Sequence, residues 1–341
     1  MSLTTIITAI VIFGTIIFVH ELGHLIFAKK FGVFCREFSL GMGPKLFSKK
    51  FGETLYSIRV LPIGGFVSMA GENDDGDDVP VGRTLNDIHK LKQSLIIFGG
   101  AFFNFILGFI ILLGMNFYIG SGEYEPIVGE IIEGSLAEEM HISSGFKIIS
   151  VNGKSVSDFD SMVDDINNAK KSGDINIVFK KGDKTITINE TGVKEDFTIG
   201  IKYKSASVSR NPILIFKNTF TQFFEMIFAM FNGFYNLIVQ FSENKNSVGG
   251  PVMIVNVIGD SVQAGILYLF QVVALLSINL GVVNLLPIPG LDGSKILIAI
   301  GEFITKKEIP RKLYIGLSLG GIVFLLFLMI LITFNDIINL I

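Results

Sequence analysis

Residues 1–28 read MSLTTIITAIVIFGTIIFVHELGHLIFA, a stretch that begins without charge and ends in a polar motif. Residues 1–20 contain no Asp, Glu, Lys or Arg, and about 20 apolar helical residues are enough to cross the hydrocarbon core of a membrane. A secretory signal peptide is the alternative, but Met1–Thr5 lacks a basic residue and no cleavage site of small residues follows. We therefore expect residues 3–27 to form a membrane helix that the mature protein retains.

Three further windows without a charged side chain follow, at residues 93–122, 261–291 and 313–335. They predict helices at about 94–119, 265–286 and 313–334, so the expected fold class is a polytopic α-helical membrane protein with four transmembrane helices. Only 17% of the 341 residues are charged, against about 25% in soluble domains. The concentration of apolar residues in four uncharged windows excludes a soluble enzyme. The single cysteine excludes a disulfide scaffold within the chain, and the net charge of −3 gives no reason to expect a nucleic acid as partner.

The basic residues predict which loops face the cytoplasm. The loop 28–92 contains ten Lys and Arg residues, and the short loop 302–312 contains four. Four spans put these two loops on one side of the membrane, and the positive-inside rule makes that side cytoplasmic. Residues 120–260 and both termini are then expected outside, and the motif at residues 20–24 lies towards the cytoplasmic side.

The expected outer segment begins with a soluble, β-rich part. Between residues 123 and 204, short apolar runs alternate with turn signals such as Asn152-Gly153, and residues 158–169 carry a helical pattern. Residues 212–241 are apolar but contain Lys217 and Glu225. We expect a helix lying on the outer membrane surface here, because a fifth span would break the loop arrangement. The acidic run Glu72–Asp78 is expected to be a solvated turn.

The motif His20-Glu21-Leu22-Gly23-His24 has the spacing of a metal site. Residues four apart on a helix share one face, so His20 and His24 can bind one metal ion. Glu21 lies about 100° round the helix, close enough to act as general base on a water that the metal activates. The alternative is a polar helix end whose histidines bind backbone groups, but such groups beside a membrane span are costly unless they have a function.

A catalytic zinc needs a third protein ligand, and Asp292 is the strongest candidate. No third histidine follows His24 at a suitable spacing, and His89 and His141 lie in polar segments. Asp292 ends the third uncharged window, directly after the proline-rich stretch 284–291. Non-helical backbone at membrane depth is tolerated where it lines a cavity or is buried in protein. The alternative is a tight turn in which Asp292 caps the next helix.

These motifs resemble the site-2 protease family, peptidase family M50, over essentially the whole chain, and within it the bacterial RseP-type intramembrane metalloproteases. The likeness rests on HELGH at residues 20–24, on Asn-x-x-Pro-x-Pro-x-Leu-Asp-Gly at 284–293, and on the β-rich part between the second and third spans. Residues 55–68, with Gly64-Gly65 as a tight turn, resemble the family's membrane re-entrant β-hairpin. Gly134-Ser135 and residues 148–154 resemble a PDZ domain.

The resemblance implies a role for each matching residue. The implied ligands of Zn²⁺ are His20, His24 and Asp292, and Glu21 is the implied catalytic base. The implied substrate-binding residues are Asn284, Pro287, Pro289, Gly64, Gly65 and Phe66, and Asn104 and Gly293 are implied to support the site. The implied division is residues 1–122 and 261–341 for the two halves of the protease core, 123–204 for a single PDZ-like domain, and 205–260 for the surface helix and a linker.

The family also implies an activity and partners. We expect a zinc-dependent endopeptidase of the bacterial cytoplasmic (inner) membrane, in contact with lipid. Its implied substrates are single-pass membrane proteins, such as anti-sigma factors already cut by a site-1 protease, and remnant signal peptides. Two other classes stay open, namely an ion or solute transporter that uses intramembrane Asp and His, and a non-enzymatic adaptor built around the PDZ-like domain.

Overall fold

The computed structural model describes residues 2–72, 79–120, 124–193, 197–205, 210–239 and 250–340. The chain divides into two compact units, one made of residues 1–115 and 219–341 and the other of residues 116–218. Most of the acidic run, residues 73–78, lies outside the described residues, so its prediction as a turn is untested.

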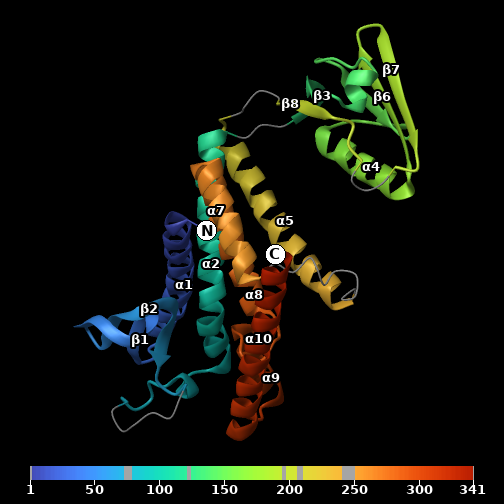
Figure 1. Cartoon of the computed structure of the whole chain (residues 1–341). Coiled ribbons are helices and arrows are strands. Elements are labelled where there is room, and N and C mark those ends of the chain that lie inside the picture. Colours follow the sequence, from blue (N-terminus) through green and yellow to red (C-terminus); the bar gives the residue numbers. More distant parts are fainter. Residues whose placement is uncertain are drawn as a thin grey trace. The chain divides into compact units, whose positions relative to one another are not determined.

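Four long helices have the length and the apolar composition to cross a membrane, which confirms the prediction of four spans in the described part of the chain. They are α1 (Leu3–Lys30), α2 (Lys90–Ile119), α8 (Ile266–Leu285) and α10 (Arg311–Leu340). These helices are gathered in the first unit (Figure 1). Which loops face the cytoplasm stays a prediction.

Glycine lets the backbones of α1 and α2 touch. A Cβ atom added at Gly23 would overlap the carbonyl group of Gly99, so no larger residue fits at this crossing. Close approach through small residues is a common way of packing helices in membranes. The contact fixes the distance between the helix that carries the HELGH motif and the helix beside it.

A helix occupies part of the stretch that we expected to be a linker. α7 (Pro251–Ala264) crosses the predicted boundary at residue 260, so the linker is shorter than predicted. The carboxylate of Asp336, on α10, accepts hydrogen bonds from the backbone N–H groups of Gly250 and Met253, both at 3.1 Å. Backbone amides at the start of a helix have no partner within the helix. The Asp336 carboxylate, far away in the sequence, therefore stabilises the start of α7 by accepting hydrogen bonds from two of them. The sequence gives no local signal for this pairing.

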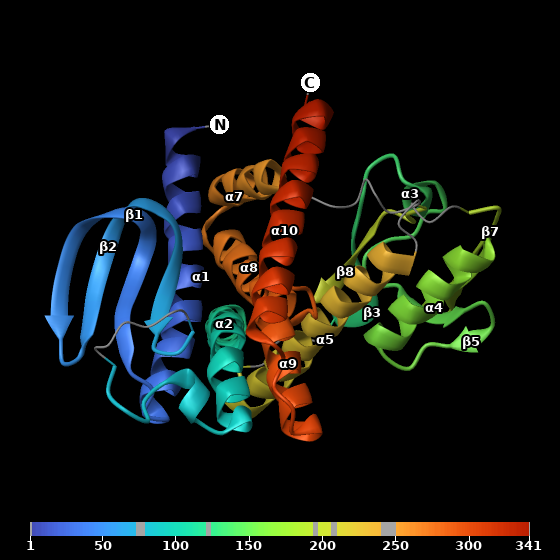
Figure 2. The same ribbon diagram turned by 90° about the horizontal axis from the view of Figure 1, so that it is seen from below.

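β1 (Cys35–Phe51) and β2 (Thr54–Met69) form a curved sheet beside α1 (Figure 2). The hairpin turns at Gly52-Glu53, where Phe51 pairs with Thr54. The strands bend so that the first part of β1 lies between residues 55–58 and 65–69 of β2. The prediction that Gly64-Gly65 forms the hairpin turn is therefore wrong. A positive φ of 81° at Gly64 instead lets β2 change direction within the strand.

The second unit is an antiparallel sheet covered by a helix. Its strand order is β7-β6-β4-β3-β8, and β5 pairs with β4. The elements are β3 (Tyr124–Ile131), α3 (Leu136–Glu139), β4 (Lys147–Val151), β5 (Lys154–Ser155), α4 (Phe159–Ser172), β6 (Asp174–Lys181), β7 (Lys184–Thr191) and β8 (Ile201–Ser205). The predicted helix at 158–169 is α4, whose first turn is capped by the side chain of Asp158. The β-rich part is confirmed, and its likeness to a PDZ domain stays a prediction.

α5 (Pro212–Val239) has one apolar face buried and one exposed. Phe223 packs with Leu112 of α2 and Ala274 of α8, whereas Phe220 and Phe228 are exposed. α5 is not among the four helices with a membrane-spanning composition in the described residues. Its position on the outer membrane surface stays a prediction.

Candidate metal centre

Two histidines of α1 and one aspartate of α9 (Asp292–Thr305) meet in the first unit. His20 and His24 lie one turn apart on α1, and both are buried. The chain leaves α8 at Leu285 and begins α9 at Asp292, after the proline-rich turn. A Cβ atom on Gly293 would overlap the carbonyl groups of Leu285 and Leu286, so glycine is needed for α9 to begin this close to α8.

The three side chains present one ligand atom each at nearly equal distances. His20 Nε2 and His24 Nε2 both lie 3.2 Å from Asp292 Oδ2, and they lie 3.2 Å from each other. Ligands about 2.0–2.1 Å from a tetrahedral zinc are separated by about 3.3 Å, because the edge of a tetrahedron is about 1.6 times the bond length. The donor set and its spacing therefore fit zinc, and a tetrahedral zinc with three protein ligands keeps one position for water or substrate.

A cavity of about 1120 Å³ adjoins this cluster, and Glu21 lines it together with His20, His24 and Asp292. Asn284 lines the cavity as well, and its Nδ2 atom lies 3.4 Å from His20 Nε2. Glu21 is thus next to the ligand atoms without being one of them, which is the arrangement that a general base needs.

The other predicted substrate-binding residues divide into two groups. Gly64, Gly65 and Phe66 of β2 line the cavity. Pro287 and Pro289 are not among the described residues that line it, and Pro289 instead packs its carbonyl group closely against Gly321 of α10. The prolines therefore shape the turn between α8 and α9.

The end of β2 borders the cavity with an edge that has no strand beside it in the described part of the chain. Residues 65–69 pair with residues 35–40 of β1 on one side, and the same residues line the cavity. Backbone N–H and C=O groups on a free strand edge can pair with an added peptide strand. The Arg59 guanidinium lies 5.1 Å from the centre of the Phe66 ring and stacks on this edge segment.

Lys295, one turn after Asp292, joins the metal centre to the loop that follows β2. Its Nζ atom lies 2.9 Å from Glu72 Oε1. Burial acts to lower the pKa of Lys295, but the carboxylates of Glu72 and Asp292 outweigh it and raise the pKa above its ordinary value. The sequence gives no signal for this ion pair, because a lysine in the first turn of a helix is not unusual.

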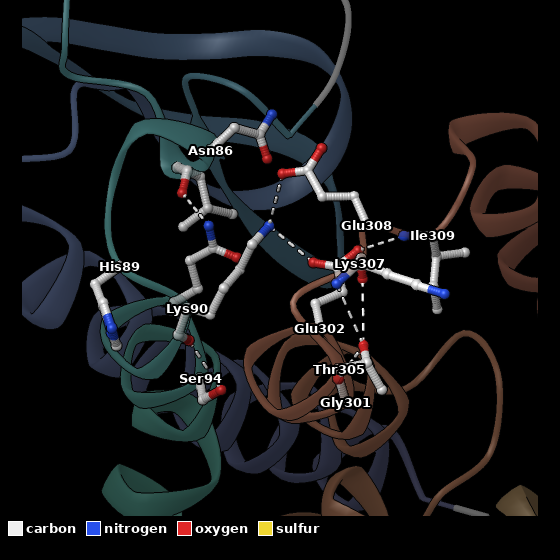
Figure 3. A network of polar contacts seen from close by, with 12 residues as sticks. Asn86, His89, Lys90, Ser94, Gly301, Glu302, Thr305, Lys307, Glu308 and Ile309 are labelled. Atoms are coloured by element: carbon white, nitrogen blue, oxygen red, sulfur yellow. Dashed lines mark hydrogen bonds and ion pairs between the residues drawn. The ribbon is translucent and has the colours of Figure 1, made fainter.

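A second polar network ties α2 to the end of α9 (Figure 3). Lys90 Nζ lies 2.8 Å from Glu302 Oε2 and 3.6 Å from Glu308 Oε1, and Glu302 also accepts a hydrogen bond from the Ile309 N–H. Burial acts to raise the pKa of Glu302, but these hydrogen bonds outweigh it, so the pKa lies below its ordinary value. Lys90, Glu302 and Glu308 line the far part of the same cavity, which is therefore bordered by charges of both signs.

The two other histidines of the chain, which the sequence gave no reason to expect as ligands, lie elsewhere. His89 makes an edge-to-face contact with Phe303, with ring centres 5.2 Å apart, and His141 belongs to the second unit. Neither is in the ligand cluster found among the described residues. The cluster consists of His20, His24 and Asp292, whose role as zinc ligands stays a prediction.

Four helices of membrane-spanning length, a His-His-Asp cluster and an adjacent glutamate in a cavity are the arrangement of a membrane-embedded metallopeptidase. Comparison with known proteins agrees with this class. The family model for peptidase family M50 matches residues 8–328. The chain belongs to peptidase family M50, which confirms the predicted family and favours a peptidase over the transporter and the adaptor.

Several relatives match over nearly their whole length. The regulator of sigma-W protease RasP of Bacillus subtilis is 31% identical over 99% of each chain. A Clostridium perfringens protein with a provisional zinc metalloprotease name is 36% identical over 98% of each chain. The zinc metalloprotease RasP of Bacillus licheniformis is 29% identical, over 98% of this chain and 99% of the relative.

Proposed function

We propose that the protein is a zinc-dependent intramembrane endopeptidase of the site-2 type, which hydrolyses peptide bonds in or near transmembrane segments of single-pass membrane proteins. The observation that carries the proposal is the triangle of His20 Nε2, His24 Nε2 and Asp292 Oδ2, with sides of 3.2 Å. The names of the relatives, zinc metalloprotease and regulator of sigma-W protease, support the same function.

The residues of this chain divide the chemistry between them. His20, His24 and Asp292 would hold the zinc, which when bound polarises the scissile carbonyl and makes water a stronger nucleophile. The Glu21 carboxylate would accept a proton from the attacking water and donate it to the leaving nitrogen. Asn284, whose amide lies beside His20, would hydrogen-bond a backbone group of the substrate next to the scissile bond.

The edge of β2 would hold the substrate. A transmembrane helix must unwind before a protease can attack its backbone, and its lost hydrogen bonds then need replacement. A strand that pairs with residues 65–69 regains such bonds and passes the metal centre, because the same residues line the cavity with Glu21.

Substrates, by this proposal, include anti-sigma factors already cut outside the membrane by a site-1 protease, and remnant signal peptides. The sigma-W role in the name of the Bacillus subtilis relative supports the first class. The β-rich unit, as a PDZ-like domain outside a bacterial cytoplasmic membrane, would admit substrates that have lost their bulky outer domain. The basic loops at 28–92 and 302–312 support this orientation.

Metal removal tests the proposal. Protein purified in detergent is expected to contain about one zinc per chain and to cut a tagged single-span protein that lacks its outer domain. A chelator should abolish cleavage together with the zinc, and added zinc should restore both, whereas added magnesium should not. Zinc is measured by atomic emission and cleavage by gel. Cleavage that persists in protein stripped of metal would contradict the proposal.

Replacing Gly65 with alanine is expected to slow cleavage about 10- to 100-fold with no loss of zinc. A Cβ atom there would lie 2.9 Å from the Ser39 carbonyl oxygen and 3.2 Å from Glu21 Cγ, so the edge strand must shift and Glu21 is crowded. None of the three ligand atoms is touched. The matched control is Gly14→Ala on α1, where a Cβ atom meets nothing within 4 Å. Zinc loss in the Gly65 variant would show that the edge strand supports the metal rather than the substrate.

A further inference from the structure

The Nδ1 atoms of His20 and His24, which are not the atoms of the ligand cluster, have different partners. His24 Nδ1 lies 3.0 Å from the backbone carbonyl oxygen of Ile96. A carbonyl oxygen only accepts hydrogen bonds, so Nδ1 of His24 must carry the ring proton. The lone pair of His24 Nε2 then points to the cluster, as a metal ligand requires. Ile96 thus fixes the tautomer of His24 through its backbone.

The partner of His20 Nδ1 is the side-chain amide of Asn104, which can donate a hydrogen bond through Nδ2 or accept one through Oδ1. Asn104 Nδ2 lies 3.2 Å from His20 Nδ1, and Asn104 is completely buried on α2. With Nδ2 donating, the proton of the imidazole is on Nε2, where a metal ligand needs a lone pair. Asn104 Oδ1, meanwhile, is buried and has no hydrogen-bond partner.

We propose that Asn104 is a positioning residue for His20, whose amide presents Oδ1 to His20 Nδ1 and so fixes the tautomer that binds zinc through Nε2. This inference rests on the proposed function. A half-turn of the amide exchanges Nδ2 and Oδ1 with almost no change in shape, and it gives the isolated Oδ1 a donor. His20 and His24 then have the same arrangement, an acceptor on Nδ1 and the metal on Nε2.

Contacts with α8 hold the backbone of α2 in place at Asn104, so the side-chain amide of Asn104 is the part that can rotate. Its backbone carbonyl accepts a hydrogen bond from Ser277 Oγ of α8 at 2.8 Å, and both residues are fully buried. Three residues before it, Ala101 is also fully buried, and its carbonyl oxygen would lie 3.2 Å from a Cβ atom on Gly281 of α8. Helix α2 therefore cannot move away from α8 without opening buried contacts.

The test measures zinc affinity, with Zn²⁺ alone, by competition against a chelator of known affinity. Asn104→Asp keeps two acceptor oxygens and loses the donor, so it is expected to bind zinc within about threefold of the unmodified protein. Asn104→Leu keeps the approximate size and loses the acceptor, and it is expected to bind zinc about 10- to 100-fold more weakly. Ser261→Ala is the control, because it removes a buried hydroxyl group that donates to a helix carbonyl, but on α7 and outside the described residues that line the cavity. It should bind zinc as the unmodified protein does.

Two results would overturn the inference. If Asn104→Asp loses as much affinity as Asn104→Leu, the amide donates rather than accepts. If Asn104→Leu binds zinc normally, the residue does not position His20. The aspartate variant decides the question even where the leucine variant fails to fold. The absorption spectrum of the Co²⁺-substituted aspartate variant, unchanged if His20 keeps its ligand geometry, gives a second readout. Absence of zinc from the unmodified protein would instead refute the proposed function.

Discussion

Replacing Gly100 with alanine is expected to remove most of the bound zinc and to reduce cleavage by at least about 100-fold. A Cβ atom at this position of α2 would lie 2.5 Å from His24 Nε2 and 2.7 Å from His20 Nε2. Side-chain Cβ atoms essentially never approach other heavy atoms within 3.0 Å, so the added methyl group would displace the two nitrogens that bind the metal.

The surrounding contacts prevent the site from relaxing round the new methyl group. His24 is held by the Ile96 carbonyl and His20 by Asn104, both of which belong to α2 itself. Helix α1 cannot turn against α2 to make room, because Gly23 already meets the backbone of Gly99. The added methyl group is therefore expected to displace the imidazole rings and to change their distances from Asp292.

Gly114→Ala is the matched control for this prediction. It makes the same change on the same helix, but a Cβ atom there meets nothing within 4 Å. It should keep its zinc and its activity, and it should stabilise α2 slightly because alanine favours helix more than glycine does. Zinc per chain and cleavage rate are measured for both variants. Full zinc occupancy in the Gly100 variant would mean that the metal is not held between these two histidines.

The sequence predicts those parts of the molecule that follow from local patterns. Uncharged runs of about 20 residues predict membrane helices because burial of a charge in lipid is costly, and all four were found. The spacing of His20 and His24 predicts their shared face, since the helical period is known. Either Ser157 or Asp158 before an amphipathic run predicts the start of α4, because both side chains can cap free amides, and the structure has Asp158 as the cap.

Other features depend on contacts between residues far apart in the chain, and the sequence carries no sign of them. A glycine pair is equally suited to a hairpin turn and to a bend within a strand, and the pairing of residues 65–69 with β1 decides between them at Gly64-Gly65. In the sequence, Gly100 is one small residue among others in an apolar run. Its contact with His20 and His24 of α1 becomes visible only in the folded structure. The packing of Pro289 on α10 has no sign in the sequence either, and the substrate contact expected of the two prolines after Asn284 stays a prediction.

Replacing Glu21 with glutamine is expected to abolish detectable cleavage, a loss of about 10²- to 10⁴-fold, while zinc content stays at the level of the unmodified protein. Glutamine has the shape of glutamate but cannot accept the proton of the attacking water. The three ligand atoms come from His20, His24 and Asp292, so the substitution removes none of them. This variant should therefore contain a normal amount of zinc and show no detectable cleavage.

The separation of these two measurements distinguishes a catalytic glutamate from a structural one. A carboxylate that merely stabilised the cavity would, when neutralised, lower zinc content or melting temperature along with activity. Glu302→Gln makes the same chemical change on the far wall of the cavity, where the carboxylate binds Lys90 rather than facing the ligand atoms, and it should cut substrate at close to the normal rate. If the Glu21 variant retains cleavage at more than about a tenth of the normal rate, the proton must be accepted by another group. Glu72, which lines the cavity and pairs with Lys295, would then be the next candidate for that group.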